Sequence, residues 1–367
     1  MNSQQKVVQR MVDRFADHIV DCTQESDIDR LLDFQQEAFG EDARQSKPRF
    51  TYWAYMRLHG SCLSYCERDG DIVGQQGRLR TTLHIGSREV PAVWATDLRV
   101  RDDWKMKGLG VALIGKLLRD YSVVMALGLS EEARKMFRRQ GWIVLGRIDA
   151  LLKPLSPRGF RPSNVAPTWW SRALGYVLHR VCRPLDLVMT TAALLTDRDI
   201  RIEAVERVDE AFAPLLARRR NEASICCERS VEFLNWRFVD CPVAHRYQRY
   251  GLWVGQDLRG FVVLRRAERF SKDVMYIDEL IADKDVLPRL IAFVIRESYR
   301  LRVDSIYYEG LGEPVSTALR KWAFLRRDTG HFFVVHSRNE IVSPDLSERS
   351  NWTLTFADSD MGFRHDR

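Results

Sequence analysis

The chain has 367 residues, of which 45% are hydrophobic and 29% charged, and its formal net charge is +7. This composition excludes an intrinsically disordered protein, and the length exceeds what one hydrophobic core usually serves, so we expect two domains. The positive charge favours an anionic partner such as CoA, an acidic carrier protein, RNA or anionic lipid, but such an excess is more often only a solvated surface.

The cysteines and the N-terminus bear on the cellular compartment. Seven cysteines give an odd count. Their spacings, such as Cys62-x3-Cys66 and the adjacent Cys226 and Cys227, match neither a zinc-binding nor a redox pattern. The first residues are polar, whereas a secretory signal needs an apolar run. We therefore expect reduced thiols, no metal and a cytoplasmic location.

In chain order, the first part of the sequence predicts strands that first form a meander and later alternate with helices. Such an order indicates an α/β fold with a mixed sheet flanked by helices. The predicted strands are 19–22, 64–67, 72–83, 93–100, 123–127 and 142–151, and the predicted helices include 28–39, a long helix through residue 117, and 131–140.

Residues 154–199 are predicted to link two domains. After a stretch with prolines and serines, apolar residues recur at helical spacing from Trp169 to Val181. Arginines and Pro184 interrupt this pattern, and the remaining apolar piece, 185–195, is too short to cross a bilayer of about 30 Å, so we expect no transmembrane segment. A linker helix packed between the domains is the expected role, and a membrane-surface or partner-binding helix is the alternative.

An internal repeat indicates two copies of one fold. Trp53 and Trp236 each begin a similar series of landmarks, and the interval from Trp53 to Trp142 nearly equals the interval from Trp236 to Phe324. We therefore predict a first half at 1–153, a linker at 154–199, a second half at 200–340 and a C-terminal tail at 341–367.

The segment 100–114 joins a predicted strand to a predicted helix and carries the clearest binding motif. Gly108 and Gly110 lie at the turn, where the free N–H groups of a helix N-terminus and the helix dipole suit a pyrophosphate. Lys105 and Lys107 add positive charge beside them. The motif is neither a complete G-x-G-x-x-G dinucleotide fingerprint nor a P-loop, which requires Gly-Lys-Ser/Thr.

The pattern Lys105-x-x-Gly108-x-Gly110 resembles the Gln/Arg-x-x-Gly-x-Gly/Ala signature of the GNAT acyltransferase superfamily, with one conservative departure at the lysine. The preceding residues, 97–100, look like the splayed strand of that family, which lies along the pantetheine arm of the cofactor. The resemblance thus implies that the cofactor bound at this turn is acetyl-CoA or another acyl-CoA.

A second family segment resembles residues 130–142, with its helical spacing intact. The resemblance covers 19–151 well and 202–335 as a weaker tandem version, and it implies two tandem GNAT-like domains. The residues that it assigns to the acyl-CoA are Leu98, Val100, Lys105, Met106, Lys107, Gly108, Leu109, Gly110, Val111, Ala112, Ser130, Ala133 and Phe137.

Two departures from the family pattern limit what the resemblance implies. Phe137 stands where the family commonly has a tyrosine that protonates the departing thiolate, and phenylalanine has no proton to give. In the second half, the loop at 282–288 has no glycine and carries two carboxylates, which would repel phosphate. We therefore expect the second half not to bind CoA in the usual way.

The resemblance implies direct transfer of the acyl group to the amine of a small-molecule acceptor, with a backbone N–H of the splayed strand stabilising the oxyanion. Asp97 is the leading candidate for the base, and His84 is a weaker one with a suitable intrinsic pKa. Asp278 and Glu279 occupy the corresponding strand of the second half and could bind the amine. A purely structural role is at least as good an explanation for all four residues.

Three other functions stay open. Tandem GNAT-like halves with one degenerate site resemble the peptidoglycan-bridge transferases, which take an aminoacyl group from tRNA, and residues 218–220, three arginines, would then contact RNA phosphates. The donor could instead be an acyl carrier protein, which shares the phosphopantetheine arm with CoA. The missing tyrosine also fits a non-catalytic acyl-CoA-binding module.

Overall fold

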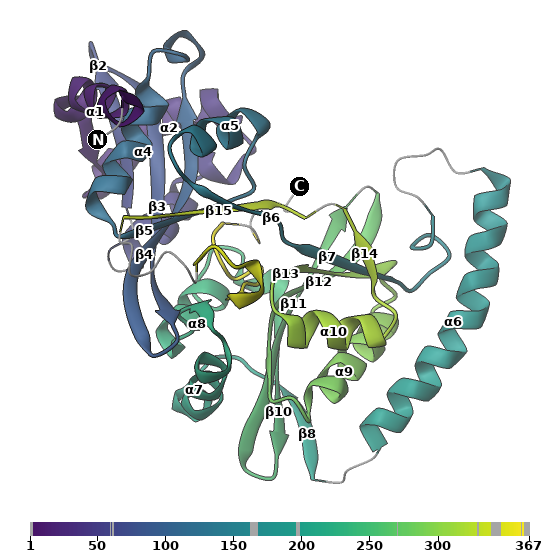
Figure 1. The fold of residues 1–367 in the computed structure, drawn as a ribbon. Coiled ribbons are helices and arrows are strands. Elements are labelled where there is room, and N and C mark those ends of the chain that lie inside the picture. Colours follow the sequence, from purple (N-terminus) through teal and green to yellow (C-terminus); the bar gives the residue numbers. More distant parts are fainter. Residues whose placement is uncertain are drawn as a thin grey trace.

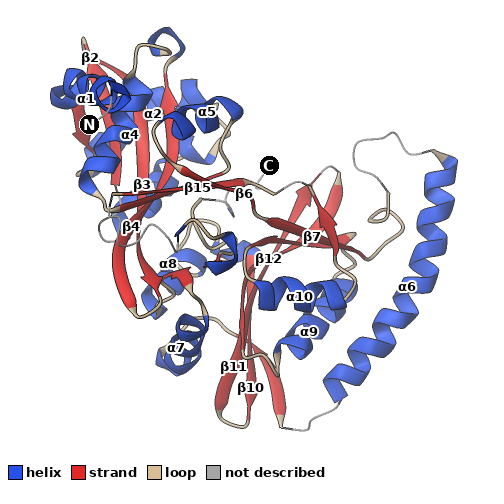
Figure 2. Ribbon diagram, in the orientation of Figure 1, coloured by secondary structure: helices blue, strands red, loops and turns tan. Residues whose placement is uncertain are grey.

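The computed structural model describes residues 3–58, 60, 62–161, 168–195, 199–269, 271–328, 330–338, 346–360 and 362. Two mixed β-sheets form the centre of the molecule, and helices pack around both of them (Figure 1). Figure 2 distinguishes the strands of these sheets from the helices that cover them. This arrangement confirms the predicted α/β fold with mixed sheets flanked by helices.

The first sheet begins as an antiparallel meander and continues with a parallel pair. β1 to β4 pair antiparallel, and β4 pairs parallel with β5. Two short strands, β9 (Ile225–Cys227) and β16 (Trp352–Thr353), extend the sheet beside the end of β3. The main strand order is β1 (Ile19–Asp21), β2 (Cys62–Arg68), β3 (Asp71–Ile85), β4 (Arg88–Val100), β5 (Val123–Leu127), β15 (Phe332–Ser337) and β6 (Ile143–Arg147).

Helices cover both faces of the first sheet. They are α1 (Ser3–Phe15), α2 (Glu25–Phe39), α3 (Pro48–Tyr52), α4 (Leu109–Asp120) and α5 (Glu131–Arg139). α1, α4 and α5 lie over one face, and α2 and α3 lie over the other. Alternate residues of β5 serve the two faces, since side chains of a strand alternate in direction: Val124 packs with the core under α4 and α5, and Met125 packs on the other side.

The second sheet repeats this plan. β12 pairs antiparallel with β11 and parallel with β13, as β4 pairs with β3 and β5. Its strand order is β14 (Leu325–Arg327), β7 (Asp149–Pro154), β13 (Ser305–Gly310), β12 (Lys272–Ala282), β11 (Asp257–Arg269), β10 (Tyr247–Val254) and β8 (Ile200–Ala204).

The helices of the second half divide between the two faces of its sheet. They are α6 (Trp169–Leu195), α7 (Ala213–Glu222), α8 (Val231–Phe238), α9 (Leu287–Arg300) and α10 (Glu313–Lys321). α9 and α10 pack on the outer face, whereas α7 and α8 lie on the side of the first half (Figure 1).

α6 lies at the outer edge of the molecule, where it packs against α9 (Figure 1). The expectation of a linker helix packed between the domains is therefore wrong; the helix follows the outside of the second half. Residues 162–167 and 196–198 of the predicted linker lie outside the described residues. Within the described part of the chain, none of the helices has both the length and the apolar character that crossing a bilayer requires.

The two sheets exchange strands. β7 belongs by sequence to the first half but pairs with β13 and β14 of the second sheet. In return, β15 comes from the second half and inserts between β5 and β6. The predicted boundary at residue 153 therefore falls inside β7. The divisions at 1–153, 154–199 and 200–340 stay predictions, and the strands of the two sheets are not divided at these residues.

The inner faces of the two sheets share one hydrophobic core, which also contains the end of the described chain. Trp352, Leu354 and Phe356 are buried in it, although the sequence indicated only a tail at 341–367. Residues 339–345 and 363–367 lie outside the described residues. The described segment 352–360 is thus part of the core that joins the two halves.

Candidate functional site

A cleft opens in the first sheet where β4 and β5 separate. The two strands pair only from Ala92 to Trp94 on β4, and beyond that point their ladder ends. The cavity between them has a volume of about 1020 Å³. It is lined by residues 39–45, 95–99 and 126–130 together with Gln76, Ile114, Ala133 and Phe137. The predicted splayed strand is therefore present, and it forms one wall of this cleft.

Four of the predicted donor-binding residues meet in the cleft, namely Leu98, Ser130, Ala133 and Phe137. Ser130 begins α5, and its side-chain oxygen accepts a hydrogen bond from the N–H of Ala133 at 3.2 Å. Phe137 is buried and stacks on Trp142, with the ring centroids 4.5 Å apart. Val100 lines a smaller hollow beside the cleft, at the end of β4.

The turn after β4 has the geometry that its glycines predicted. Gly108 is the N-terminal capping residue of α4 and has φ of +90°, a conformation that other residues rarely adopt. A Cβ at Gly108 would also lie 3.0 Å from Sδ of Met11 in α1. At Gly110, by contrast, the nearest atom to a Cβ is Cγ2 of Val100 at 3.8 Å, so this position has room.

The other predicted residues of the turn do not place their side chains in the cleft. Leu109 and Ala112 are fully buried under α1, so only their backbone can face a ligand. Met106 is fully exposed. Lys105 pairs with Asp102 at 2.6 Å, and Lys107 lies over the ring of Trp104. Val111 is half-buried in the first turn of α4.

Asp97 lies at an irregularity in β4. The register passes from the pair of Gln75 and Arg99 to the pair of Gly77 and Thr96, so that Asp97 has no direct partner on β3. Its φ is +48°, which is strained for a residue with a side chain. This irregularity directs the Asp97 carboxylate away from the strand ladder and toward the loop at 44–45.

Both carboxylate oxygens of Asp97 are occupied. One accepts a hydrogen bond from Nε2 of Gln45 at 2.7 Å and lies 3.6 Å from the guanidinium of Arg44. The other accepts from the hydroxyl of Tyr55, whose pKa is raised well above its ordinary value by burial and by Asp97. The prediction of Asp97 as base stays a prediction, but these contacts favour a positioning role.

The sequence did not indicate the partners of Asp97. Arg44 also binds Asp360, whose carboxylate lies 2.7 Å from its guanidinium, so the end of the described chain is tied to the cleft. Tyr55 lies two residues after Trp53, at the start of the sequence repeat, and belongs to no catalytic motif. Arg44 and Gln45 lie in a loop without a motif, and Asp360 lies in the predicted tail, so no local pattern could have joined them.

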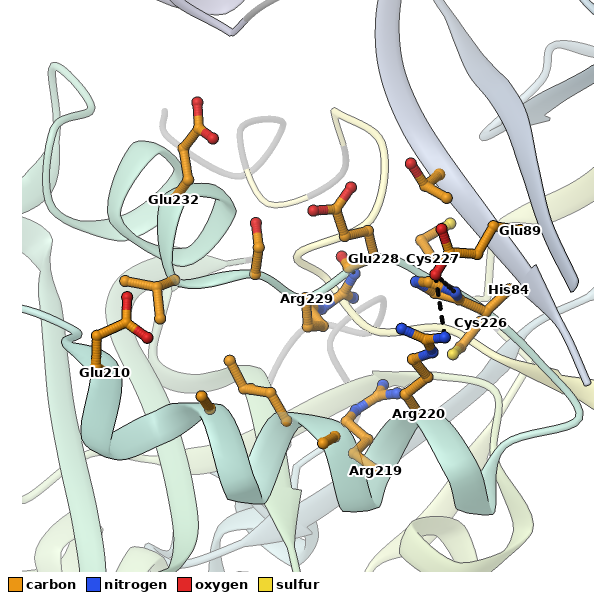
Figure 3. A pocket seen from close by; sticks show the side chains of 16 residues that line it. His84, Glu89, Glu210, Arg219, Arg220, Cys226, Cys227, Glu228, Arg229 and Glu232 are labelled. Carbon is orange, nitrogen blue, oxygen red and sulfur yellow. Dashed lines mark hydrogen bonds and ion pairs between the residues drawn. The ribbon is translucent and has the colours of Figure 1, made fainter. Parts of the chain in front are cut away.

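His84 lies in a different pocket. It lines a cavity of about 560 Å³ between β3, β9 and α7, where Glu89 approaches both His84 and Arg220 (Figure 3). Burial and the charge of Arg220 lower the pKa of His84. Residues 76 to 84 of a strand span about 26 Å at about 3.3 Å per residue. The prediction that His84 serves the same site as Asp97 is therefore not supported.

Asp278 and Glu279 are fully buried on β12 and line neither pocket. Asp278 accepts from Nε of Arg265 at 2.6 Å, and Glu279 accepts from Nε of Arg229 at 2.6 Å. The predicted binding of an amine by these carboxylates is thus not supported, because each is committed to a buried ion pair. Asp278 nevertheless lies at a register shift of its sheet, as Asp97 does.

The counterpart of the cleft in the second half is filled by the protein itself. Beyond the last paired residues of β12 and β13, Glu279 accepts a hydrogen bond from the hydroxyl of Thr355, and Arg229 binds Asp358 at 2.7 Å. In the loop after β12, Asp283 faces Arg218 and Arg259. This loop presents paired carboxylates where the first half presents Gly108.

Comparisons with known proteins identify the fold. The chain matches no protein-family model, and a search of curated proteins found no relative. Among solved structures, it is similar to a GCN5-related N-acetyltransferase from Anabaena variabilis, with a TM-score of 0.61 and 10% identity over 88% of this chain and 73% of that chain. A GCN5-related N-acetyltransferase from Kribbella flavida has a TM-score of 0.57 and 15% identity, covering 87% and 70%.

The N-myristoyltransferase of Saccharomyces cerevisiae, solved with bound myristoyl-CoA, is also similar. Its TM-score is 0.56 and its identity 14%, and the match covers 91% of this chain and 88% of that chain. These likenesses confirm that the chain has the GNAT fold that its motifs resembled, across most of its length.

Proposed function

We propose that this protein transfers an acyl group from acyl-CoA to an amine, and that the pantetheine arm and thioester of the donor lie in the cleft between β4 and β5. The cleft is the observation that carries the proposal. It opens where two parallel strands separate, and its wall β4 ends at Val100, from which a short 3-10 helix (Asp102–Trp104) leads to Gly108 at the start of α4. The neighbouring structure with myristoyl-CoA supports a thioester donor.

The residues of the turn fit the pyrophosphate of CoA. The first N–H groups of an α-helix have no partner within the helix, and they point along the positive end of its dipole. Gly110 leaves the space beside these groups open. Lys105 and Lys107 are exposed and lie just before Gly108 in the chain, where they would help to attract the phosphates.

The chemistry needs little from acidic or basic side chains. The amine nitrogen, in its unprotonated form, attacks the thioester carbonyl. A C–N bond forms and the nitrogen releases a proton to water, while the C–S bond breaks and the thiolate leaves. Backbone N–H groups of residues 95–99, which border the cleft beyond the ladder with β5, suit the oxyanion. Phe137 cannot protonate the thiolate, but a thiol with a pKa of about 8.5 leaves as the thiolate and takes its proton from water.

The arrangement offers less support for tRNA as donor. Of the three arginines at 218–220, Arg218 pairs with Asp283 at 2.9 Å and Arg220 pairs with Glu89 at 3.0 Å, so two of the three already face carboxylates. An acyl carrier protein would place the same phosphopantetheine arm in the same cleft. We therefore propose acetyl-CoA or a longer acyl-CoA as the donor and a small-molecule amine as the acceptor.

Release of the CoA thiol tests this function. Acetyl-CoA and myristoyl-CoA are each incubated with the protein and a panel of primary amines, and free thiol and acylated amine are measured together. We expect thiol release that requires both protein and amine. Binding of acyl-CoA without turnover of any amine would instead support the non-catalytic module, and turnover only with an acylated carrier protein would identify a different donor.

A further inference from the structure

The faces of α6 are reversed relative to an ordinary amphipathic helix. Its buried residues are Gly175, Asp186 and Thr190, which are small or polar. Asp186 accepts hydrogen bonds from Nζ of Lys153 and from the hydroxyl of Tyr299, both at 2.8 Å. At Gly175 a Cβ would lie 2.5 Å from a backbone oxygen, so the helix approaches its support closely. Polar contacts and close packing thus attach α6 to the protein.

The opposite side of α6 carries a continuous apolar surface. Seven large hydrophobic residues recur at intervals of three or four, apart from one longer interval at the end, and each is between 59% and 75% exposed. Such spacing places them on one face of the helix. We call this face the α6 stripe; it consists of Trp170, Leu174, Val177, Val181, Leu185, Val188 and Leu195.

An exposed surface of this size calls for a partner, because soluble proteins rarely leave a long contiguous apolar patch in water. Figure 1 shows α6 at the edge of the molecule, with its outer side away from the other described elements. Trp169 and Trp170 lie at the beginning of the helix and are both about two-thirds exposed. Tryptophan favours the boundary between lipid headgroups and acyl chains.

The charges of α6 decide between a membrane and a second copy of the chain. The helix contains Arg172, Arg180 and Arg183, which are exposed, and its only acidic residue is the buried Asp186. By helical spacing Arg180 flanks the α6 stripe, whereas Arg172 and Arg183 lie on other sides of the helix. A second copy docked through the stripe would place two helices of net positive charge side by side, whereas an anionic lipid surface complements this charge and accepts the long Arg180 side chain at the headgroups.

We propose that α6 docks this protein on an anionic lipid surface. The helix lies in the plane of the interface, with the α6 stripe among the acyl chains and Arg180, which flanks the stripe, at the headgroups. It lies along the surface because its opposite face is held to the protein between Gly175 and Thr190. The proposal is independent of the acyltransferase activity, since it concerns binding without donor or acceptor.

Co-sedimentation with vesicles tests the proposal. The full chain is mixed with vesicles of phosphatidylcholine alone or of phosphatidylcholine with phosphatidylglycerol, over a range of salt concentrations. We expect binding to the anionic vesicles that weakens with salt, and at least tenfold weaker binding to the neutral ones. The double variant Val181→Asp/Val188→Asp should lose at least tenfold in binding, because it places two carboxylates in the α6 stripe.

A matched control is Leu325→Asp, the same kind of change at a residue that is 49% exposed on β14. It should bind as the wild type does, and thermal melting should show that both variants fold. Equal binding by the wild type and the α6 variant, or no binding to anionic vesicles, overturns the proposal. So does a concentration-dependent dimer in sedimentation velocity that the α6 variant abolishes, since the stripe would then belong to a second copy.

Discussion

Trp53 and Trp236 stack on each other with their ring centroids 4.7 Å apart, and each indole N–H donates to the backbone carbonyl of the other residue, at 2.9 and 3.1 Å. These two residues begin the two copies of the sequence repeat. Because the two hydrogen bonds are reciprocal, the pair lies on an approximate two-fold axis between the halves. The shared core is therefore built around the repeat itself.

Replacing either tryptophan should strongly destabilise the whole molecule. Both are nearly fully buried, so we expect Trp53→Ala to lower the free energy of unfolding by about 3–5 kcal/mol. Trp53→Phe should lower it by less, because phenylalanine keeps an aromatic ring in the core. It should still have an effect, because the carbonyl of Trp236 loses its hydrogen-bond donor. Chemical denaturation measures the free energy of unfolding of both variants. The control is Trp170→Ala at an exposed position, which should stay within about 0.5 kcal/mol of the wild type. Equal effects of Trp53→Ala and Trp170→Ala would contradict the central role of the pair.

The repeat and the donor motif were predictable from sequence because both depend on local spacing. The pattern of Gly108 and Gly110 predicted a turn into a helix, and the structure has it. The strand exchange was not predictable, since β7 and β15 have ordinary apolar patterns that fit either sheet. Only the packing of both halves together determines which sheet each strand joins.

The roles of charged residues were the least predictable part. Asp278 and Glu279 occupy positions that match Asp97 in the repeat, but Asp278 pairs with Arg265 of the adjacent strand β11, and Glu279 pairs with Arg229 from a segment 50 residues away. Arg229 and Asp358 are far apart in sequence, and no pattern relates them. The sequence pattern of a strand is the same whether its carboxylate faces a cleft or a buried guanidinium. The environment in the folded protein therefore decides the role of the carboxylate.

The buried ion pairs of Arg229 should be needed for stability. Glu279 and Asp358 both lose their partner in Arg229→Ala, and uncompensated buried charges are costly, so we expect a loss of about 3–5 kcal/mol in the free energy of unfolding. As a control, Arg207→Ala removes an exposed pair with Asp240 and should have little measurable effect. Denaturation midpoints of the two variants that coincide would show that the buried network contributes nothing special.

Replacement of Asp97 separates the role of a base from that of a positioning residue. Because both its oxygens are already occupied, we expect Asp97→Asn to lower kcat by about tenfold or more through misplacement of β4, without changing the shape of the pH profile. Asp257→Asn, which removes an exposed carboxylate on β11 outside the cleft, is the matched control and should leave kcat unchanged. Loss of the acidic limb of the profile in Asp97→Asn would instead identify Asp97 as the base.

Acid should destabilise the protein partly through His336 on β15. Burial and the charge of Arg338 lower the pKa of His336 in the folded state, so the unfolded chain takes up a proton first. The contribution of His336 is complete above a pH of about 6.5 and is lost as the pH falls toward the lowered pKa. We expect His336→Gln to lose less stability than the wild type between about pH 7 and pH 5. The exposed His245→Gln should behave as the wild type, and an unchanged pH dependence in His336→Gln would refute this assignment.

Calorimetric titration of acyl-CoA into the wild type and into Gly110→Val tests the donor site most directly. Gly110 has room for a side chain in the protein alone, so the variant should keep its melting temperature while the added methyl groups obstruct the pyrophosphate. We expect the wild type to bind acyl-CoA and the variant to bind at least tenfold more weakly. Equal affinity of the two proteins, or no binding to the wild type, would contradict the placement of acyl-CoA at this turn.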